Sequence, residues 1–251
     1  MIVLKTAEDI KKLEKSAKIV AEVLLKLKEI AKPGVETMEF DLLARKISKE
    51  LGARPAFLGY RGFPASVCIS INDEVVHGIP SKGRFLKEGD IVSIDFGAEY
   101  EGFYGDATIT AGVGNISAKA KRLIEITEKA LYKGIEKAAA GNKLGDISSA
   151  IQQYVESNNF SVVRDFVGHG IGRELHEEPL VPNYGKKGTG PDLRPGMILA
   201  IEPMVNEKGY EIEILENEWT VVTKDKGLSA HFEHDVAITE NGPVILSKLG
   251  E

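Results

Sequence analysis

The order of predicted elements occurs twice in this chain, and this repetition is the feature that most restricts its fold. A long helix, a glycine, a short helix and then strands begin near residue 7 and again near residue 118. One constant offset in numbering carries Gly34 to Gly141, Phe40 to Ile147, Ala44 to Ile151 and Ile47 to Tyr154. Any two amphipathic helices can be aligned, so this match alone leaves chance open. A true duplication predicts two αβ halves about a pseudo-twofold axis, with a site between them.

The hydrophobic pattern separates helical segments from strands. Apolar residues recur at helical spacing over four segments, at 7–31, 38–51, 118–140 and 147–158. Thr6 is a predicted N-cap, and Thr37, Ser117 and Asp146 stand directly before the other three segments. Apolar and β-branched runs predict strands at 66–71, 90–100, 103–110, 160–164, 197–205, 211–216, 219–223 and 232–239. We therefore expect an α+β fold.

Length and charge exclude several classes of protein. The 251 residues contain no long linker, so we expect one domain over 1–251 with halves at about 1–112 and 113–251. A net charge of −6 argues against general nucleic-acid binding. Residues 1–15 lack a signal-peptide core, and no apolar run reaches membrane-spanning length. With Cys68 as the single cysteine, no disulfide forms within the chain. We expect a cytoplasmic protein that does not enter membranes.

Two acids lie inside consecutive apolar strands. Asp95 is in the segment 91–97, and Asp106 is in the segment 104–108. A hairpin with its tip at residues 100–101 would place the two acids opposite each other on one face. Either acid alone is explained by a turn cap or by backbone hydrogen bonds. Two adjacent carboxylates repel, so the pair favours a shared proton or, better, a bound cation.

Two further acids and a histidine complete the set. Glu202 ends the apolar run 197–203, and Glu233 shares a strand face with His231 and Asp235. His169 stands among three glycines at positions 168, 170 and 172. A lone histidine is more often a core or loop residue, and the glycine spacing does not match a dinucleotide-binding loop. Four acids in apolar strands exceed what surface solvation explains.

This combination of donors narrows the chemistry of the site. Carboxylates with one imidazole form a hard, oxygen-rich site that suits Mn, Fe(II), Co or Zn. Four carboxylates are balanced by two divalent cations, which about 3.5–4 Å apart activate a shared water and stabilise an oxyanion. A single-iron site with two histidines and one carboxylate leaves three acids unexplained. The residues therefore predict hydrolytic chemistry.

The same residues, in this order, resemble the type I methionine aminopeptidases of peptidase family M24. The matching segments are Asp95 and Asp106 eleven positions apart, 168–172, 175–179, 200–203 and 232–234. The resemblance covers nearly the whole chain. It implies the pita-bread fold, in which two pseudo-twofold-related αβ halves surround a curved antiparallel sheet. It also implies a cytoplasmic, monomeric metalloprotease that removes methionine from nascent N-termini when the second residue is small, near the ribosome exit region.

The resemblance assigns a role to each matching residue. Asp95 and Asp106 would bind one metal ion, and Asp106 and Glu233 would bridge to a second ion. His169 and Glu202 would complete the second site, and Glu202 would be the general base. The remaining two roles fall to histidines: His176 would stabilise the oxyanion and His77 would hydrogen-bond the scissile nitrogen.

A methionine pocket is also implied. Its lining would be Cys68, Tyr60, Phe63 and Trp219, with Phe57 and Leu175 nearby. The alternative for these residues is ordinary hydrophobic core.

The sequence departs from the family pattern at four positions. His231 stands where glutamine is expected, Asp235 stands where threonine is expected, and Phe63 and Leu175 stand where different aromatic residues are expected.

Three other interpretations compete with this one. Prolidases and Xaa-Pro aminopeptidases of the same fold usually carry an extra N-terminal domain and a further histidine near position 173, which is arginine here. Type II methionine aminopeptidases insert a helical subdomain between His169 and Glu202, and the segment between these two residues is too short to hold one. A non-enzymatic binding protein of this fold would have lost metal ligands, and all five are present.

Overall fold

A computed structural model describes residues 1–248 of the chain. Its described part contains four α-helices in two pairs. The first pair is α1 (Ala7–Glu29) and α2 (Thr37–Glu50), and the second is α3 (Ala118–Ile135) and α4 (Leu144–Ser157). A short 3-10 turn, η1 (Tyr60–Gly62), follows α2. None of the described helices has the length and apolarity needed to cross a bilayer.

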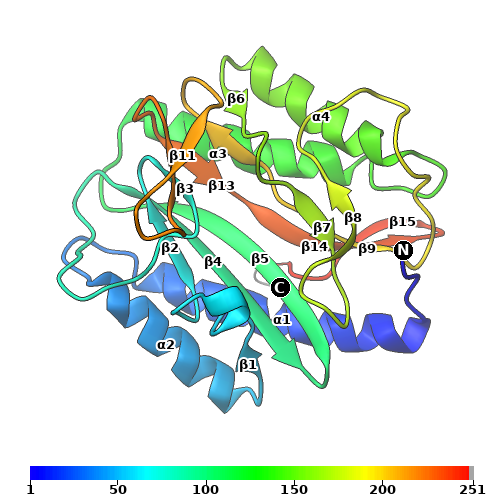
Figure 1. The fold of residues 1–251 in the computed structure, drawn as a ribbon, viewed down its shortest axis with the longest axis horizontal. Helices are drawn as coiled ribbons and strands as arrows, with labels where there is room; N and C mark the ends of the chain where they lie inside the picture. Colours follow the sequence, from blue (N-terminus) through cyan, green and yellow to red (C-terminus); the bar gives the residue numbers. More distant parts are fainter. Residues whose placement is uncertain (249–251) are drawn as a thin grey trace.

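A curved antiparallel sheet of nine strands lies between the two helix pairs (Figure 1). Its strands follow the order β1 (Arg54–Pro55), β4 (Ile91–Tyr100), β5 (Phe103–Gly112), β14 (Glu233–Thr239), β9 (Ile198–Ile201), β7 (Gly168–Gly170) and β8 (Glu177–Val181). Two more strands pair with members of this row, β2 (Cys68–Ile71) with β4 and β15 (Gly242–Ile245) with β14. The predicted α+β class is confirmed.

Two three-stranded sheets complete the described part of the fold. One has the order β13 (Ser229–His231), β10 (Met204–Asn206) and β6 (Ser161–Val162). The other has the order β11 (Ile212–Ile214), β12 (Val221–Thr223) and β3 (Glu74–Val76). The second sheet joins the two halves of the chain, because β3 comes from the first half and β11 and β12 from the second.

Local sequence explains how α1 is placed on the β4–β5 hairpin. The hydroxyl of Thr6 accepts the N–H of Asp9 at 3.2 Å, so Thr6 caps α1 as predicted. The helix then packs along β4 and β5. Gly105 permits this approach, because a Cβ at that position would lie 2.7 Å from the backbone nitrogen of Ala17. The hairpin is therefore held directly against a helix.

Equivalent contacts recur at the predicted numbering offset between the two halves. The amide of Gly34 donates to the carbonyl of Leu86, and the amide of Gly141 donates to the carbonyl of Leu193. Both glycines have positive φ, 87° and 89°. The helices that follow, α2 and α4, each have 14 residues. The two halves thus repeat the same local contacts at equivalent positions, as the duplication hypothesis requires.

Several predicted boundaries differ from the structure. The third helix ends at Ile135 rather than at residue 140, and α2 already begins at Thr37, which is therefore not its cap. Asp146 is inside α4, where its carboxylate accepts the N–H of Lys143 at 2.8 Å. The predicted strand 197–205 is two strands, because Pro203 lacks the N–H that a continuous ladder needs.

Candidate metal centre and substrate pocket

The β4–β5 hairpin carries the first two acids. Its register pairs Asp95 with Thr108 and Gly97 with Asp106. The acids are therefore diagonal neighbours on one face, and the expectation that they stand directly opposite each other is wrong. The reason is the tight turn at Glu101 and Gly102, whose φ values of 52° and 80° let the strands close between residues 100 and 103.

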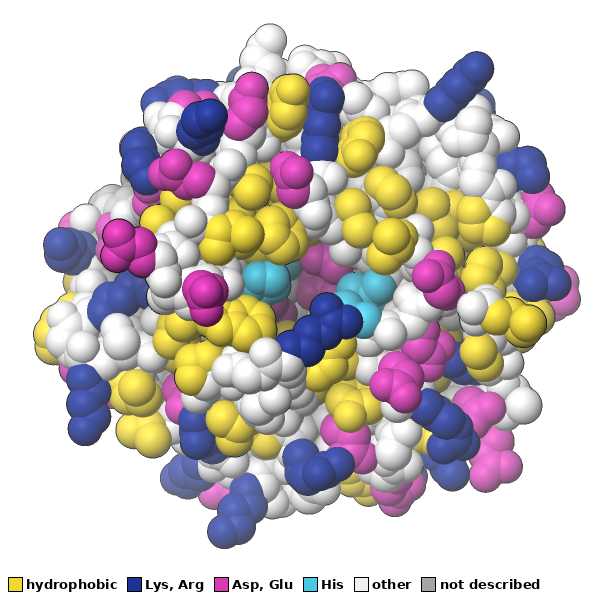
Figure 2. All heavy atoms as spheres, in the orientation of Figure 1, with side chains coloured by type: hydrophobic (Ala, Val, Ile, Leu, Met, Phe, Trp, Pro, Cys, Tyr) yellow, Lys and Arg dark blue, Asp and Glu magenta, His cyan; other side chains and the backbone are white. Residues whose placement is uncertain are grey.

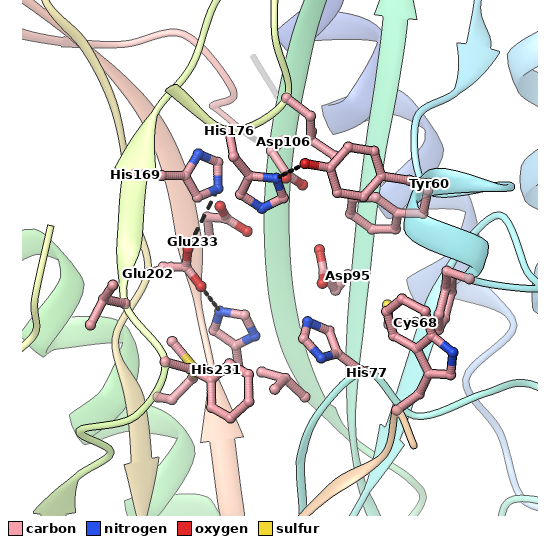
Figure 3. A pocket seen from close by; sticks show the side chains of 18 of the residues that line it. Tyr60, Cys68, His77, Asp95, Asp106, His169, His176, Glu202, His231 and Glu233 are labelled. Atoms are coloured by element: carbon pink, nitrogen blue, oxygen red, sulfur yellow. Dashed lines mark hydrogen bonds and ion pairs between the residues drawn. The ribbon is translucent and has the colours of Figure 1, made fainter. Parts of the chain in front are cut away.

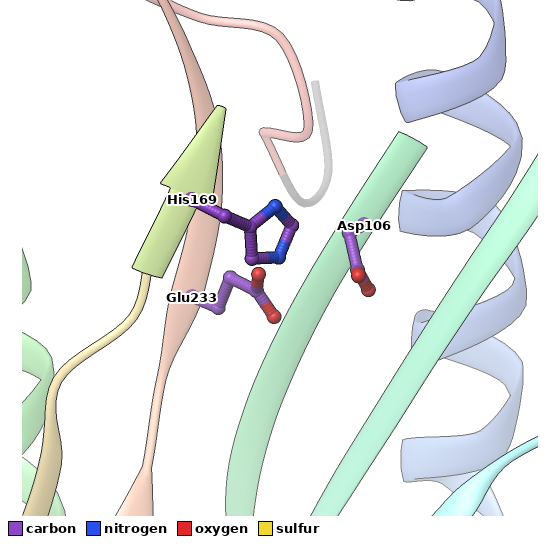
Figure 4. A group of neighbouring side chains, drawn as sticks. All are labelled: Asp106, His169 and Glu233. Carbon is purple, nitrogen blue, oxygen red and sulfur yellow. The ribbon is translucent and has the colours of Figure 1, made fainter. Parts of the chain in front are cut away.

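The neighbouring strands bring a histidine and a third acid to the same place. Glu233 begins β14 and pairs with Thr108, whose hydroxyl donates to Glu233 Oε2 at 2.8 Å. His169 lies in the middle of β7. Asp106, His169 and Glu233 are buried, and each offers a ligand atom within 4.8 Å of the others (Figure 4). These three of the predicted ligands form a tight cluster.

Glu202 and Asp95 line the same cavity as this cluster (Figure 3). Glu202 follows directly after β9, and its Oε1 lies 3.6 Å from His169 Nε2. All five predicted metal ligands therefore face one cavity of about 260 Å³. From outside, acidic side chains are visible in a hollow flanked by histidines and hydrophobic side chains (Figure 2).

The buried oxygens of this cluster lack partners. Asp95 Oδ1, Asp106 Oδ1 and Glu233 Oε1 have no hydrogen bond within the described part of the chain. Burial raises the pKa of Asp95 to about 6 and that of Glu202 to about 7. Burial, together with neighbouring carboxylates, also raises the pKa of Asp106 and Glu233 well above their usual range. Unpaired buried carboxylates are costly, and a divalent cation among them removes that cost.

The histidine of the cluster is oriented to bind such a cation. His169 Nδ1 lies 2.9 Å from the carbonyl oxygen of Gly170. A carbonyl only accepts, so Nδ1 carries the proton and the Nε2 lone pair is free for a metal ion. The donor set of oxygens and one imidazole fits the harder divalent metals.

Two further histidines line the cavity near its mouth. Burial lowers the pKa of His77 to about 4 and that of His176 to about 3, so both rings are neutral at pH 7. His176 Nδ1 lies 2.8 Å from the Tyr60 hydroxyl. The His77 ring meets Trp219 nearly at right angles, with centroids 6.2 Å apart. Neutral imidazoles supply hydrogen bonds without adding charge.

The predicted methionine pocket is continuous with the acidic cluster. All of its six predicted members line the same cavity, namely Phe57, Tyr60, Phe63, Cys68, Leu175 and Trp219. Phe63 and Trp219 make an edge-to-face contact with centroids 5.1 Å apart. Burial raises the pKa of the Cys68 thiol well above its usual range, so it is a neutral, soft part of the wall.

Some lining residues were not predicted. Arg61, Val76, Phe166, Val167 and Met204 also face the cavity. Each of them stands within three positions of a predicted site residue, which was the available signal. Of the two departures near Glu233, His231 lines the cavity and Asp235 does not. Asp235 is buried in the protein interior, where its carboxylate accepts the N–H of Asp106 at 2.8 Å.

Comparisons with known proteins agree with this geometry. The model for metallopeptidase family M24 matches residues 11–240. The methionine aminopeptidase of Clostridium perfringens is 56% identical, over 98% of this chain and 99% of the relative. Methionine aminopeptidase 1 of Bacillus subtilis is 50% identical, over 99% of this chain and all of the relative.

Solved structures show the same pattern of similarity. A methionine aminopeptidase from Thermotoga maritima superposes with a TM-score of 0.97 and 49% identity, covering 99% of this chain and all of that one. The prolidase from Pyrococcus horikoshii OT3 superposes with a TM-score of 0.80 and 27% identity. It covers all of this chain, which spans only 65% of the prolidase.

Proposed function

This chain belongs to metallopeptidase family M24 and, within it, to the methionine aminopeptidases, and from that premise we propose which of its residues carry out the reaction. It has the pita-bread fold that its sequence implied. It is a hydrolase that removes N-terminal methionine. The prolidase alternative is supported only by more distant likeness.

We propose that two divalent ions, of Co, Mn, Fe(II) or Zn, bind between the halves. Asp95, Asp106 and Glu233 would hold one ion, and Asp106, His169, Glu202 and Glu233 would hold the other. Ions at such a site lower the pKa of a water molecule and stabilise negative charge on a carbonyl oxygen. The support is the set of buried, unpartnered carboxylate oxygens together with the free Nε2 of His169.

Glu202 is the proposed general base. Its carboxylate takes a proton from the attacking water as the water oxygen bonds to the carbonyl carbon of methionine. The proton then passes to the leaving nitrogen as the C–N bond breaks, which releases methionine and the shortened chain.

The two mouth histidines are proposed to bind the reacting amide. If the Tyr60 hydroxyl donates to Nδ1 of His176, the Nε2–H of that ring points its hydrogen at the developing oxyanion. His77 would hydrogen-bond the nitrogen of the scissile bond. Because both rings are neutral at pH 7, each can donate an N–H hydrogen bond without adding positive charge beside the acids.

The apolar part of the cavity is the proposed methionine pocket. The aromatic rings of Tyr60, Phe63 and Trp219 and the thiol of Cys68 provide soft, polarisable contacts for a thioether. The observation that carries this proposal is that one cavity joins this apolar wall to the acidic cluster. A free N-terminal amine then finds carboxylates beside the side chain that the pocket holds.

We also propose the setting in which the enzyme works. The chain would act as one catalytic domain and as a monomer on nascent polypeptides whose second residue is small. Such action on nascent chains would take place in the cytoplasm, near the ribosome exit.

A peptide panel tests the proposed function. The protein is stripped of metal and then titrated with Mn, Co, Fe(II) or Zn, and methionine release from Met-Ala-Ser is compared with cleavage of an Ala-Pro dipeptide. We expect release of methionine that depends on added metal, with maximal rate at two ions per chain. Cleavage of Ala-Pro without methionine release would contradict the proposal.

A further inference from the structure

His231 is buried at the cavity wall beside the proposed general base. Its Nε2 has no hydrogen-bond partner within the described part of the chain. That nitrogen lies 3.5 Å from Glu202 Oε2, while the other carboxylate oxygen, Oε1, lies 3.6 Å from His169 Nε2 (Figure 3). The Glu202 carboxylate therefore stands between two imidazole rings, with one oxygen facing each.

The backbone around His231 is fixed by neighbouring strands. Its N–H donates to Thr110 Oγ1 at 2.9 Å, and the same hydroxyl donates to the His231 carbonyl at 2.8 Å. The pairing of β10 with β13 sets His231 opposite Met204, and Met204 is two positions after Glu202 in the chain. The strand pairing therefore fixes the backbone positions from which the two side chains meet.

The two imidazoles cannot play the same part. Since the Gly170 carbonyl holds the proton of His169 on Nδ1, its Nε2 is an acceptor suited to a metal ion. A carboxylate oxygen only accepts hydrogen bonds, so a favourable contact with His231 requires a proton on its Nε2. A small rotation about the terminal torsion of Glu202, which is soft, shortens 3.5 Å to a normal hydrogen bond.

We propose that His231 is a positioning residue, whose Nε2–H donates to Glu202 Oε2 and holds that carboxylate in the orientation in which it accepts a proton. Oε2 keeps a second lone pair for the proton of the attacking water. This inference rests on the proposed role of Glu202 and extends it to a residue that departs from the family pattern. A partner of this kind affects turnover rather than binding of the substrate.

Two variants of His231 separate donation from metal binding. A glutamine amide donates a hydrogen bond from a similar position but is a poor metal ligand, whereas leucine does neither. With Met-Ala-Ser at saturating MnCl2, we expect His231→Leu to lower kcat about 10- to 100-fold with KM changed less than about 2-fold. We expect His231→Gln to restore kcat to within about 3-fold of the wild type, as a donor at this place requires. Equal loss in both variants, or no loss in His231→Leu, overturns the proposal.

His234 provides the matched control. It is also buried, its Nδ1 lies 3.0 Å from Ser247 Oγ, and it does not line the cavity. His234→Gln is expected to keep the wild-type kcat. Calorimetric titration of each metal-free variant with MnCl2 is expected to give the same number of bound ions as the wild type. Loss of an ion in both His231 variants would instead identify a metal ligand and overturn the positioning role.

A measurement without metal or turnover tests the contact directly. Nitrogen-15 spectra of histidine-labelled, metal-free protein are expected to show the His231 proton on Nε2. Glu202→Ala is expected to shift that resonance, because it removes the acceptor. A proton on Nδ1 alone contradicts the proposal. If the wild type released no methionine, the proposed function would fail, and this spectrum would still decide the His231 contact.

Discussion

Single residues hold the acids of the cavity in place against their mutual repulsion. The Thr108 hydroxyl bonds one oxygen of Glu233 and leaves the other without a partner in the described chain. The Asp235 carboxylate bonds the backbone of Asp106 rather than its side chain. The Glu233 side chain and the Asp106 backbone are thus each fixed by one contact, while one carboxylate oxygen of each acid has no partner in the described chain. This arrangement orients ligands before any ion binds, which lowers the cost of binding it.

Glu202→Gln tests the general base at this scale. The amide cannot accept a proton, so we expect kcat for Met-Ala-Ser at saturating metal to fall by about 10² to 10⁴. Glu213→Gln is the control, because Glu213 is exposed on β11 and does not line the cavity. Near wild-type turnover in Glu202→Gln would show that another group takes the proton.

Cys68→Trp tests the methionine pocket. The thiol is buried in the cavity wall, so an indole at this position fills space that the substrate side chain needs. We expect kcat/KM for methionine release to fall by at least about 10² if the lost fit costs about 3 kcal/mol. Cys68→Ser, which keeps the volume, should retain most activity. Intact cleavage by Cys68→Trp, with the fold verified by circular dichroism, would remove Cys68 from the pocket.

At the scale of elements, the β4–β5 hairpin carries Asp95 and Asp106, and α1 packs against this hairpin. Gly105 is next to Asp106, at a point where the backbone of α1 leaves no room for a Cβ on the hairpin. The site therefore depends on a packing contact directly beside a proposed ligand.

Gly105→Ala tests that contact. Its Cβ would lie 2.7 Å from Ala17 N and 2.8 Å from the carbonyl carbon of Ser16, so α1 must move. We expect the free energy of unfolding to fall by about 2–4 kcal/mol, measured from urea denaturation. The atoms nearest to a Cβ at Gly112, in the same strand, belong to the side chain of Ile116 rather than to backbone, so Gly112→Ala should cost less. Equal stabilities of the two variants would contradict this account of the packing.

The elements also show which parts of the fold the sequence predicts. Long helices with capping residues and the apolar strands β4 and β5 follow from local pattern. The hairpin register cannot be predicted in this way, because it depends on a positive φ at Glu101, which is uncommon for glutamate. The strand β7 was also missed, since glycine-rich runs have low strand propensity. Its glycines are there because the carbonyls of Ala200 and Glu178 leave no room for a Cβ.

At the scale of the whole molecule, the site is a product of long-range pairing. Its five predicted ligands were identified from residue type and motif, and the structure brings them to one cavity. The contact of His231 with Glu202 could not be predicted, because it requires the pairing of β10 with β13, two strands that β11 and β12 separate along the chain. Sequence patterns therefore identify the chemical groups, and non-local register decides which of them touch.

The burial of so many acids makes the metal-free protein sensitive to pH. Burial raises the pKa of Asp95 to about 6, of Glu202 to about 7 and of Asp235 to about 8, whereas in the unfolded chain such groups ionise near pH 4. An acid whose pKa is raised in the folded state stabilises the fold at low pH. That stabilisation is lost as the pH rises through the folded-state pKa. The buried histidines have lowered pKa values, so their ionisation changes the free energy of unfolding only below about pH 6.5.

We therefore expect metal-free protein to lose at least about 1 kcal/mol of unfolding free energy between about pH 6.5 and pH 8.5. Protein saturated with MnCl2 should lose less, because the ions stabilise the ionised carboxylates. Urea denaturation at both pH values, with and without chelator, measures the difference. A metal-free midpoint that stays constant or rises over this range would show that these acids are already ionised in the fold.

The numbering offset that carries Gly34 to Gly141 also carries Asp95 to Glu202. Two proposed ligands thus occupy equivalent positions in the two halves of the chain. In a strictly symmetric arrangement of two identical halves, this position would set two carboxylates facing each other across the axis, where a cation between them would relieve their repulsion.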